Sequence, residues 1–138
     1  MVLRKVVQLF LRVTRRTKED HEAHLLLNGW LQKRGEVVET WKRRWFTLSE
    51  TELKWFSSES AHYALGSIQI AEVYQIRSAK SSALKLDKGH DVECTFIVLD
   101  NQRTYFLEAE SSMRCYEWIQ TISELILAHQ QSHTENFD

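Results

Sequence analysis

The spacing of hydrophobic positions changes twice along this chain. Over residues 2–18, apolar residues recur at helical spacing opposite a basic face. From residue 29 the spacing shortens towards alternation, in seven runs rich in β-branched and aromatic residues that indicate strands. The runs are residues 29–34, 41–48, 52–57, 66–73, 74–79, 94–100 and 104–109. Residues 111–129 return to helical spacing, with Ser111 or Ser112 as the candidate N-cap.

This order of elements predicts a mainly β domain. Seven closely spaced strands without intervening helices favour an antiparallel barrel or sandwich. The final helix carries an apolar stripe, which we expect to cover the open end of that barrel. The stripe consists of Cys115, Trp118, Ile119, Ile122, Leu125 and Ile126. We therefore expect a basic amphipathic helical arm at residues 1–27, the domain at 28–130 and a polar tail at 131–138.

Length and charge narrow the possible classes of protein. A chain of 138 residues has room for one domain with a modest core. Residues 1–18 contain six basic residues and no acidic residue. Residues 19–138 therefore contain the other twelve basic residues and all nineteen acidic ones, and their net charge is −7. This balance argues against general nucleic-acid binding, which favours a strongly basic domain. Cys94 and Cys115 fit no metal or disulfide pattern and are expected to be reduced core residues of a cytosolic protein.

No pattern in the sequence indicates catalysis. There is no P-loop, no GxSxG motif, no dinucleotide fingerprint and no plausible Cys–His nucleophile pair. His21 and His24 could chelate a metal as an i, i+3 pair. They are one residue short of the HExxH spacing, however, and lack a nearby third ligand. We expect neither a metal nor another cofactor, and no enzymatic activity.

The stretch WKRRWF, at residues 41–46, places three bases inside a strand-like run. Strand alternation puts Lys42 and Arg44 on one face with Phe46 and Leu48, and Arg43 on the other face. If residues 29–34 and 41–48 form a hairpin, Lys33 joins the same face beside the loop. The three bases then line the rim of the barrel above an apolar interior. Such a rim suits a multiply charged anion, because charge-assisted bonds to phosphate are strong.

The series GWLQKRG, WKRRWFTL and LKWF, followed by a helix carrying EWIQTI, resembles the pleckstrin homology (PH) domain over residues 28–130. The resemblance implies a PH-like seven-stranded, bent barrel-like sandwich closed by a C-terminal helix, and no catalysis. Members that bind 3-phosphorylated inositol lipids show a lysine on the first strand and a Lys/Arg-x-Arg on the second. Lys33 and the run of residues 42–44 match that pattern.

The resemblance also implies roles for single residues. Arg44 would make the central bidentate phosphate contact, with Lys33 and Lys42 on flanking phosphates and Arg34 as a further donor. Trp55 stands where strong binders commonly offer a tyrosine hydroxyl, and its indole N–H is the expected donor there.

The loops around this rim differ from those of strong binders. Glu36 and Glu39 in the first loop repel phosphate, Leu65 precedes Gly66 where some members place arginine, and Arg103 is the only base of the short last turn.

Two further segments are candidates for membrane contact. Val37 and Val38 form an apolar loop tip beside the phosphate site and could enter the bilayer interface. The arm has three readings: a helix packed on the domain, an interfacial anchor whose Arg12, Arg15 and Arg16 face anionic lipid, or a mitochondrial presequence.

The sequence thus predicts a cytoplasmic module that binds phosphoinositides or other anionic lipid and acts peripherally at the plasma or endosomal membrane. The alternative is a protein-interaction module with weak or no headgroup binding, in which the barrel edge or terminal helix binds a partner peptide.

Overall fold

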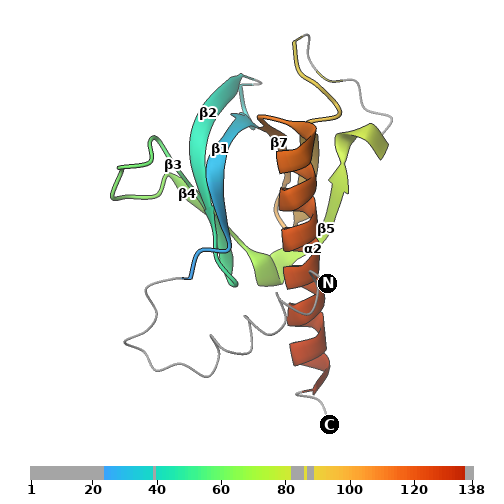
Figure 1. Ribbon diagram of the computed structural model, residues 1–138. Coiled ribbons are helices and arrows are strands. Elements are labelled where there is room, and N and C mark those ends of the chain that lie inside the picture. The colour runs from blue at the N-terminus through green and yellow to red at the C-terminus, as the bar shows by residue number, and fades with distance from the viewer. Residues whose placement is uncertain (1–23, 39, 82–85, 87–88, 136–138) are drawn as a thin grey trace.

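The computed structural model describes residues 24–38, 40–81, 86 and 89–135, and in these residues seven strands precede one long helix (Figure 1). The strands are β1 (Leu27–Arg34), β2 (Trp41–Leu48), β3 (Glu52–Phe56), β4 (Gly66–Gln69), β5 (Val73–Ser78), β6 (Thr95–Asp100) and β7 (Thr104–Ala109). The helix is α2 (Ser112–Glu135), and two short 3-10 helices, η2 (Ile70–Glu72) and η3 (Ala79–Ser81), flank β5. The predicted order of strands followed by a helix is confirmed.

The strands form one antiparallel sheet in the order β4-β3-β2-β1-β7-β6-β5. Its two halves, β1–β4 and β5–β7, are joined by a short ladder in which Leu31–Lys33 of β1 pair with Leu107–Ala109 of β7. Figure 1 shows β1–β4 on one side of the molecule and β5 on the other, with α2 running alongside. A seven-stranded antiparallel sheet capped by a C-terminal helix is the core of the predicted fold class.

The connection between β4 and β5 corrects one predicted strand. Residues 66–73 were expected to form a single strand, but β4 ends at Gln69 and η2 follows. The physical reason is the sheet order. Because β4 and β5 are the two edges, the chain must leave one edge and cross to the other. Ile70, at the start of the crossing, is 1% exposed and packs in the core, which explains why the apolar pattern continues through a break in the strand.

Helix α2 covers the core as its apolar stripe predicts. Trp118 is 1% exposed and packs with Phe46 of β2 and Phe96 of β6 in one continuous cluster. The backbone N–H of Arg114 donates to Ser111 Oγ at 3.1 Å. Of the two predicted N-cap candidates, Ser111 is therefore the residue that caps the helix. The helix continues to Glu135, past its predicted end at residue 129 and into the segment predicted to be a polar tail.

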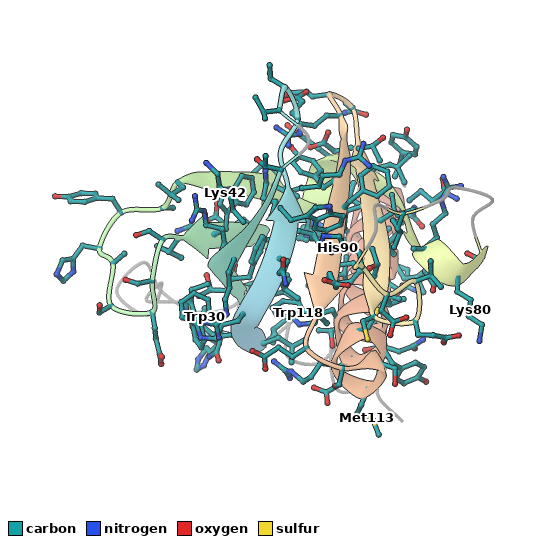
Figure 2. All side chains as sticks on the ribbon, turned by 90° about the horizontal axis from the view of Figure 1, so that it is seen from above. Trp30, Lys42, Lys80, His90, Met113 and Trp118 are labelled. Atoms are coloured by element: carbon teal, nitrogen blue, oxygen red, sulfur yellow. The ribbon has the colours of Figure 1, made fainter. Side chains whose placement is uncertain are left out.

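Tryptophan side chains on the outer face of β1 and β2 contact neighbouring aromatic rings. Trp45 meets Trp30 edge-on with ring centroids 5.3 Å apart, and Trp41 stacks on His90 at 4.0 Å. His90, labelled in Figure 2, lies 2.9 Å from a Glu108 carboxylate oxygen, which fixes the end of the β5–β6 connection to the sheet. Trp41 and Trp45 therefore pack against neighbouring segments.

The two cysteines and the N-terminal arm can also be compared with their predictions. Cys115 is buried and unbridged, whereas Cys94 lies in a turn before β6 and is only partly buried, so Cys94 is not the core residue that was expected. Burial raises the pKa of the Cys115 thiol to about 11. Residues 1–23 of the predicted helical arm lie outside the described residues. Its last four residues, 24–27, are not helical, because Leu27 already begins β1 and pairs with Leu48 of β2. In the described part of the chain, no helix is long and apolar enough to cross a membrane.

Candidate functional site

A basic pocket lies at the end of the β1–β2 hairpin. Its cavity of about 340 Å³ is lined by Lys33, Gly35, Val38, Thr40, Lys42, Arg44, Trp55 and Leu65. Four of the five residues predicted to bind phosphate therefore line one cavity. The exception is Arg34, which does not line the cavity. Lys42 can be located in Figure 2.

Strand geometry explains why the three bases converge. Lys33 pairs directly with Lys42 across the β1–β2 ladder, and Leu31 pairs with Arg44. Side chains alternate along each strand, so Lys33, Lys42 and Arg44 share the face that carries Leu31 and Phe46 deeper in the barrel. The apolar interior begins one pleat below the bases, as the sequence predicts. Like charges so close repel one another, which favours a site for an anion that neutralises them.

On the opposite face of β2, the charge of Arg43 is offset by neighbouring side chains. Arg43 lies over the ring of Trp30 at 4.0 Å and reaches Glu110 at 3.5 Å. By contrast, among the described residues no acidic side chain forms an ion pair with Lys33, Lys42 or Arg44. Within the described part of the chain, the charges of these three bases are thus not offset by an ion pair.

The aromatic ring of Trp55 forms the floor of the pocket. The ammonium of Lys33 stands 5.0 Å above the ring of Trp55, a cation–π contact that holds the base over the cavity. Trp55 lies in turn near Phe46 and Tyr105, with ring centroids 5.8 and 6.1 Å away. Trp55 thus offers the face of its ring to the Lys33 ammonium, in addition to the indole N–H that the sequence suggested as a donor. The Trp55 ring lies directly on Gly66, its ladder partner on β4.

Electrostatics single out Lys33 within this group. Desolvation by burial lowers the pKa of Lys33 below its usual value of 10.5, and the charges of Arg103 and Arg44 lower it further. The carboxylate of Glu36 acts in the opposite direction. An anion bound in the pocket would favour the charged form of Lys33, because its negative charge would offset the effect of the neighbouring cations.

The remaining predicted residues lie apart from the pocket floor. Arg34 stands over the ring of Phe106 at 4.4 Å, on the other face of β1 from Lys33. Val37 and Val38 form the exposed loop tip, with 93% and 65% of their surfaces accessible, and Val38 also borders the cavity. Arg12, Arg15 and Arg16 lie outside the described residues, so their expected contact with lipid stays a prediction.

Two residues near the pocket were not predicted as site residues. Arg103 and Tyr105, from the β6–β7 turn and β7, lie beside the aromatic floor, with the Arg103 guanidinium 4.3 Å above the Tyr105 ring. Burial raises the pKa of Tyr105, as does the neighbouring carboxylate of Asp100. The sequence marks Arg103 only as the single base of its turn, which says nothing about its distance from Lys33.

A larger cavity, of about 540 Å³, lies between η2, the start of β5 and the C-terminal part of α2. Among the residues that the structure describes, its lining includes Glu72, Tyr74 and His129 but no lysine or arginine. The basic pocket, with three described bases, is therefore the better candidate for an anion. Among the described residues, no group of three or more His, Cys, Asp or Glu side chains could hold a metal ion.

A sheet of this order, capped by one C-terminal helix and with a basic pocket at its first hairpin, is the architecture of a PH domain. The family model for the PH domain matches residues 25–127. The chain belongs to the PH domain family, which confirms the resemblance seen in the sequence. The match begins three residues before the predicted domain start at residue 28, and β1 begins one residue before it.

Relatives and solved structures agree with this assignment. The chain is 29% identical over 114 residues to pleckstrin homology domain-containing protein 1 of Arabidopsis thaliana, covering 79% of this chain and 74% of that protein. It is 31% identical over 94 residues to the mouse (Mus musculus) dual adapter for phosphotyrosine and 3-phosphotyrosine and 3-phosphoinositide, covering 68% of this chain but only 31% of the adapter. The C-terminal PH domain of pleckstrin, in its crystal structure with D-myo-Ins(1,2,3,5,6)P5, superposes with a TM-score of 0.61 at 23% identity, over 75% of this chain and 97% of that one.

Proposed function

We propose that this PH domain binds phosphoinositide headgroups through Lys33, Lys42 and Arg44 and thereby recruits the chain to membranes, without catalysing a reaction. The observation that carries the proposal is the convergence of these three bases on one cavity, with no ion-pair partner among the described acidic residues. Arg44 is the base best suited to a bidentate phosphate contact, because its guanidinium presents two parallel donors.

The relatives support a phosphorylated ligand. The name of the mouse adapter includes a 3-phosphoinositide, and the pleckstrin domain was solved with an inositol pentakisphosphate. An inositol pentakisphosphate presents several phosphates on one ring, which is the charge pattern that three converging bases can match. The fold shared with the pleckstrin domain supports the comparison, and the three bases of this chain line a cavity at its first hairpin.

Membrane contact would add to headgroup binding. Val37 and Val38 stand exposed beside the pocket, so a headgroup bound there would bring the loop tip to the bilayer interface. Each base near an anionic surface contributes about 1 kcal/mol. The six bases of residues 1–18 could therefore match the pocket in importance. We propose a peripheral location at the cytoplasmic face of the plasma or endosomal membrane.

The test is co-sedimentation with phosphatidylcholine liposomes that each contain one phosphoinositide, at physiological salt. The intact chain is compared with Arg44→Glu, with a chain lacking residues 1–20, and with one control variant. Arg43→Glu is the matched control, because it makes the same charge change on the neighbouring residue but on the opposite face of β2. We expect Arg44→Glu to abolish selective binding, and Arg43→Glu to retain most of it.

Other outcomes would contradict the proposal in distinct ways. Equal losses for Arg43→Glu and Arg44→Glu would mean that general charge attraction, not the pocket, binds the lipid. Binding to any anionic liposome that disappears only with residues 1–20 would assign the anchoring to the arm. If the intact chain binds no liposome, the domain recognises a protein partner instead.

A further inference from the structure

Helix α2 buries a carboxylate on the side that faces away from the core. Glu124 lies two positions from Ile122 and two from Ile126, which belong to the apolar stripe packed against the sheet. Residues two apart on a helix are separated by about 200° around its axis, so Glu124 points away from that stripe. Glu124 is nevertheless only 6% exposed, and Ala128, four positions further on, is 3% exposed. A segment other than the sheet therefore covers this part of α2.

The covered carboxylate is not neutralised by the described part of the chain. Glu124 Oε2 is buried and accepts no hydrogen bond, and no described base forms an ion pair with Glu124. Burial raises the pKa of the Glu124 carboxyl, because its charged form loses hydration. Buried carboxylates are normally paired with a cation or a hydrogen-bond donor. A positively charged group is therefore the partner that this position favours.

Residues 2–18 of the arm have the charge and the length that this surface requires. Their sequence carries six bases and no acid, and its helical spacing places an apolar face opposite the basic one. The rest of the chain has a net charge of −7, so the arm is its most strongly basic segment. As a helix, residues 2–18 would be about 25 Å long, enough to span the middle of α2.

The described chain enters the domain beside α2. The N–H of Leu26 donates to the Leu48 carbonyl oxygen at 2.7 Å, so the chain joins the sheet at the end of β2. Two residues after Leu48, the carbonyl oxygen of Glu50 accepts a hydrogen bond from His129 Nε2 of α2 at 2.9 Å. Glu50 is itself only 8% exposed, and its Oε2 has no hydrogen-bond partner in the described part of the chain. Residues 2–18 are therefore tethered close to the C-terminal half of α2.

We propose that residues 2–18 dock on the outward face of α2, where one of their bases neutralises Glu124, and that anionic lipid competes with α2 for these bases. The docking is independent of the headgroup pocket, whereas the competition rests on the proposed recruitment to membranes. A base that pairs with Glu124 cannot contact a lipid phosphate at the same time. The protein in solution would therefore offer fewer of its bases to a membrane than the protein whose arm has left α2.

Hydrogen–deuterium exchange of the intact chain, followed by mass spectrometry of peptides from residues 1–20, measures the docking. Glu124→Lys replaces the buried carboxylate by a repelling charge, and Glu93→Lys is its matched control, because it makes the same charge change on an exposed acid. Val6→Asp places a charge on the apolar face of the arm, and its control Gln8→Asp places the same charge on the polar face. Val6→Asp lies outside the folded domain, so it tests the docking even if Glu124→Lys destabilises α2.

We expect exchange in residues 1–20 to become about tenfold faster in Glu124→Lys and in Val6→Asp, because breaking a buried charge pair or burying a lone charge is costly. Both controls should exchange like the intact chain. The double variant should exchange no faster than either single one, because an arm that has left α2 cannot be released again. Changing the partner base to Glu in the Glu124→Lys background should restore slow exchange, and testing the six bases in turn identifies that partner.

Sedimentation with phosphatidylcholine vesicles that contain phosphatidylserine but no phosphoinositide measures the competition. Glu124→Lys should bind these vesicles about fivefold more tightly than Glu93→Lys, which is the effect of one released base near an anionic surface. The two variants have the same net charge, so the difference reports the release of the arm. It should persist when Arg44→Glu is added to both, because these vesicles offer no headgroup to the pocket.

Three results would overturn the inference. Unchanged exchange in both Glu124→Lys and Val6→Asp would show that the arm does not dock on α2. Slow exchange that depends on protein concentration would mean that the arm docks on a second copy of the chain. Equal vesicle binding by Glu124→Lys and Glu93→Lys would refute the competition with lipid. None of these measurements contains a phosphoinositide, so the headgroup pocket is judged separately, by the binding of Arg44→Glu to phosphoinositide liposomes.

Discussion

Gly66→Ala tests how the floor of the pocket is built. Gly66 faces Trp55 across the β3–β4 ladder, and the indole ring lies over the glycine. A methyl group at this position would stand 2.6 Å from Trp55 Cε2 and 2.8 Å from Cη2, and closer still to Cζ2. Carbon atoms that are not bonded prefer about 3.5–4.0 Å, so the ring must move by roughly 1 Å or more.

The size of the effect follows from what the ring contacts. Overpacking of this kind costs about 1–3 kcal/mol, and the displaced ring also loses part of the Lys33 contact, worth about 0.5–1 kcal/mol. We therefore expect the free energy of unfolding to fall by about 2 kcal/mol. For a domain of this size, 1 kcal/mol corresponds to about 4 °C in Tm, so Tm should fall by about 8 °C. Ligand affinity should fall about threefold, because Lys33 loses its support.

The assay combines thermal unfolding with calorimetric titration of inositol hexakisphosphate, at a temperature where both proteins are folded. Ser67→Ala is the control, because it changes the next residue of the same strand, whose side chain is exposed. An unchanged Tm would show that Trp55 can leave Gly66 at no cost, which contradicts the packing argument. A lower Tm with unchanged affinity would show that the ring supports the fold but not the site.

Two further predictions concern the pocket base and the core. Because the pKa of Lys33 is lowered in the free protein and a bound anion favours its charged form, raising the pH from 7 to 10 should weaken binding of inositol hexakisphosphate. Lys33→Arg should remove most of that loss, and equal pH profiles for the two proteins would contradict the assignment. Trp118→Ala should lower the free energy of unfolding by about 3–5 kcal/mol in urea, since its side chain is 1% exposed. Tyr116→Ala, at an exposed position of the same helix, should change it by less than about 0.5 kcal/mol. Comparable losses for both would show that Trp118 is not a core anchor.

Much of the fold could be predicted from the sequence because its signals are local. Alternation in residues 41–48 assigns Lys42 and Arg44 to one face and Arg43 to the other, and the ladder pairing of β1 with β2 agrees. The apolar stripe around Trp118 and the cap at Ser111 likewise depend on residues within a few turns of one another. Such patterns follow from the periods of helices and strands, whatever the rest of the chain does.

Other features depend on how distant strands are brought together. The split of residues 66–73 into β4, η2 and β5 follows from which strands are the sheet edges, and an apolar run does not encode that. The position of Arg34 over Phe106 depends on the pairing of β1 with β7, which joins segments far apart in sequence.

The sequence by itself determined the succession of elements and the faces on which the three pocket bases lie, because backbone geometry repeats over two to four residues. Only the tertiary structure decided that the β6–β7 turn reaches the mouth of the first hairpin, where Arg103 meets Glu36. It also decided that the Trp55 ring lies over Gly66. Both depend on the bend of the sheet, which arises from the packing of all seven strands against α2 and is encoded in no single segment.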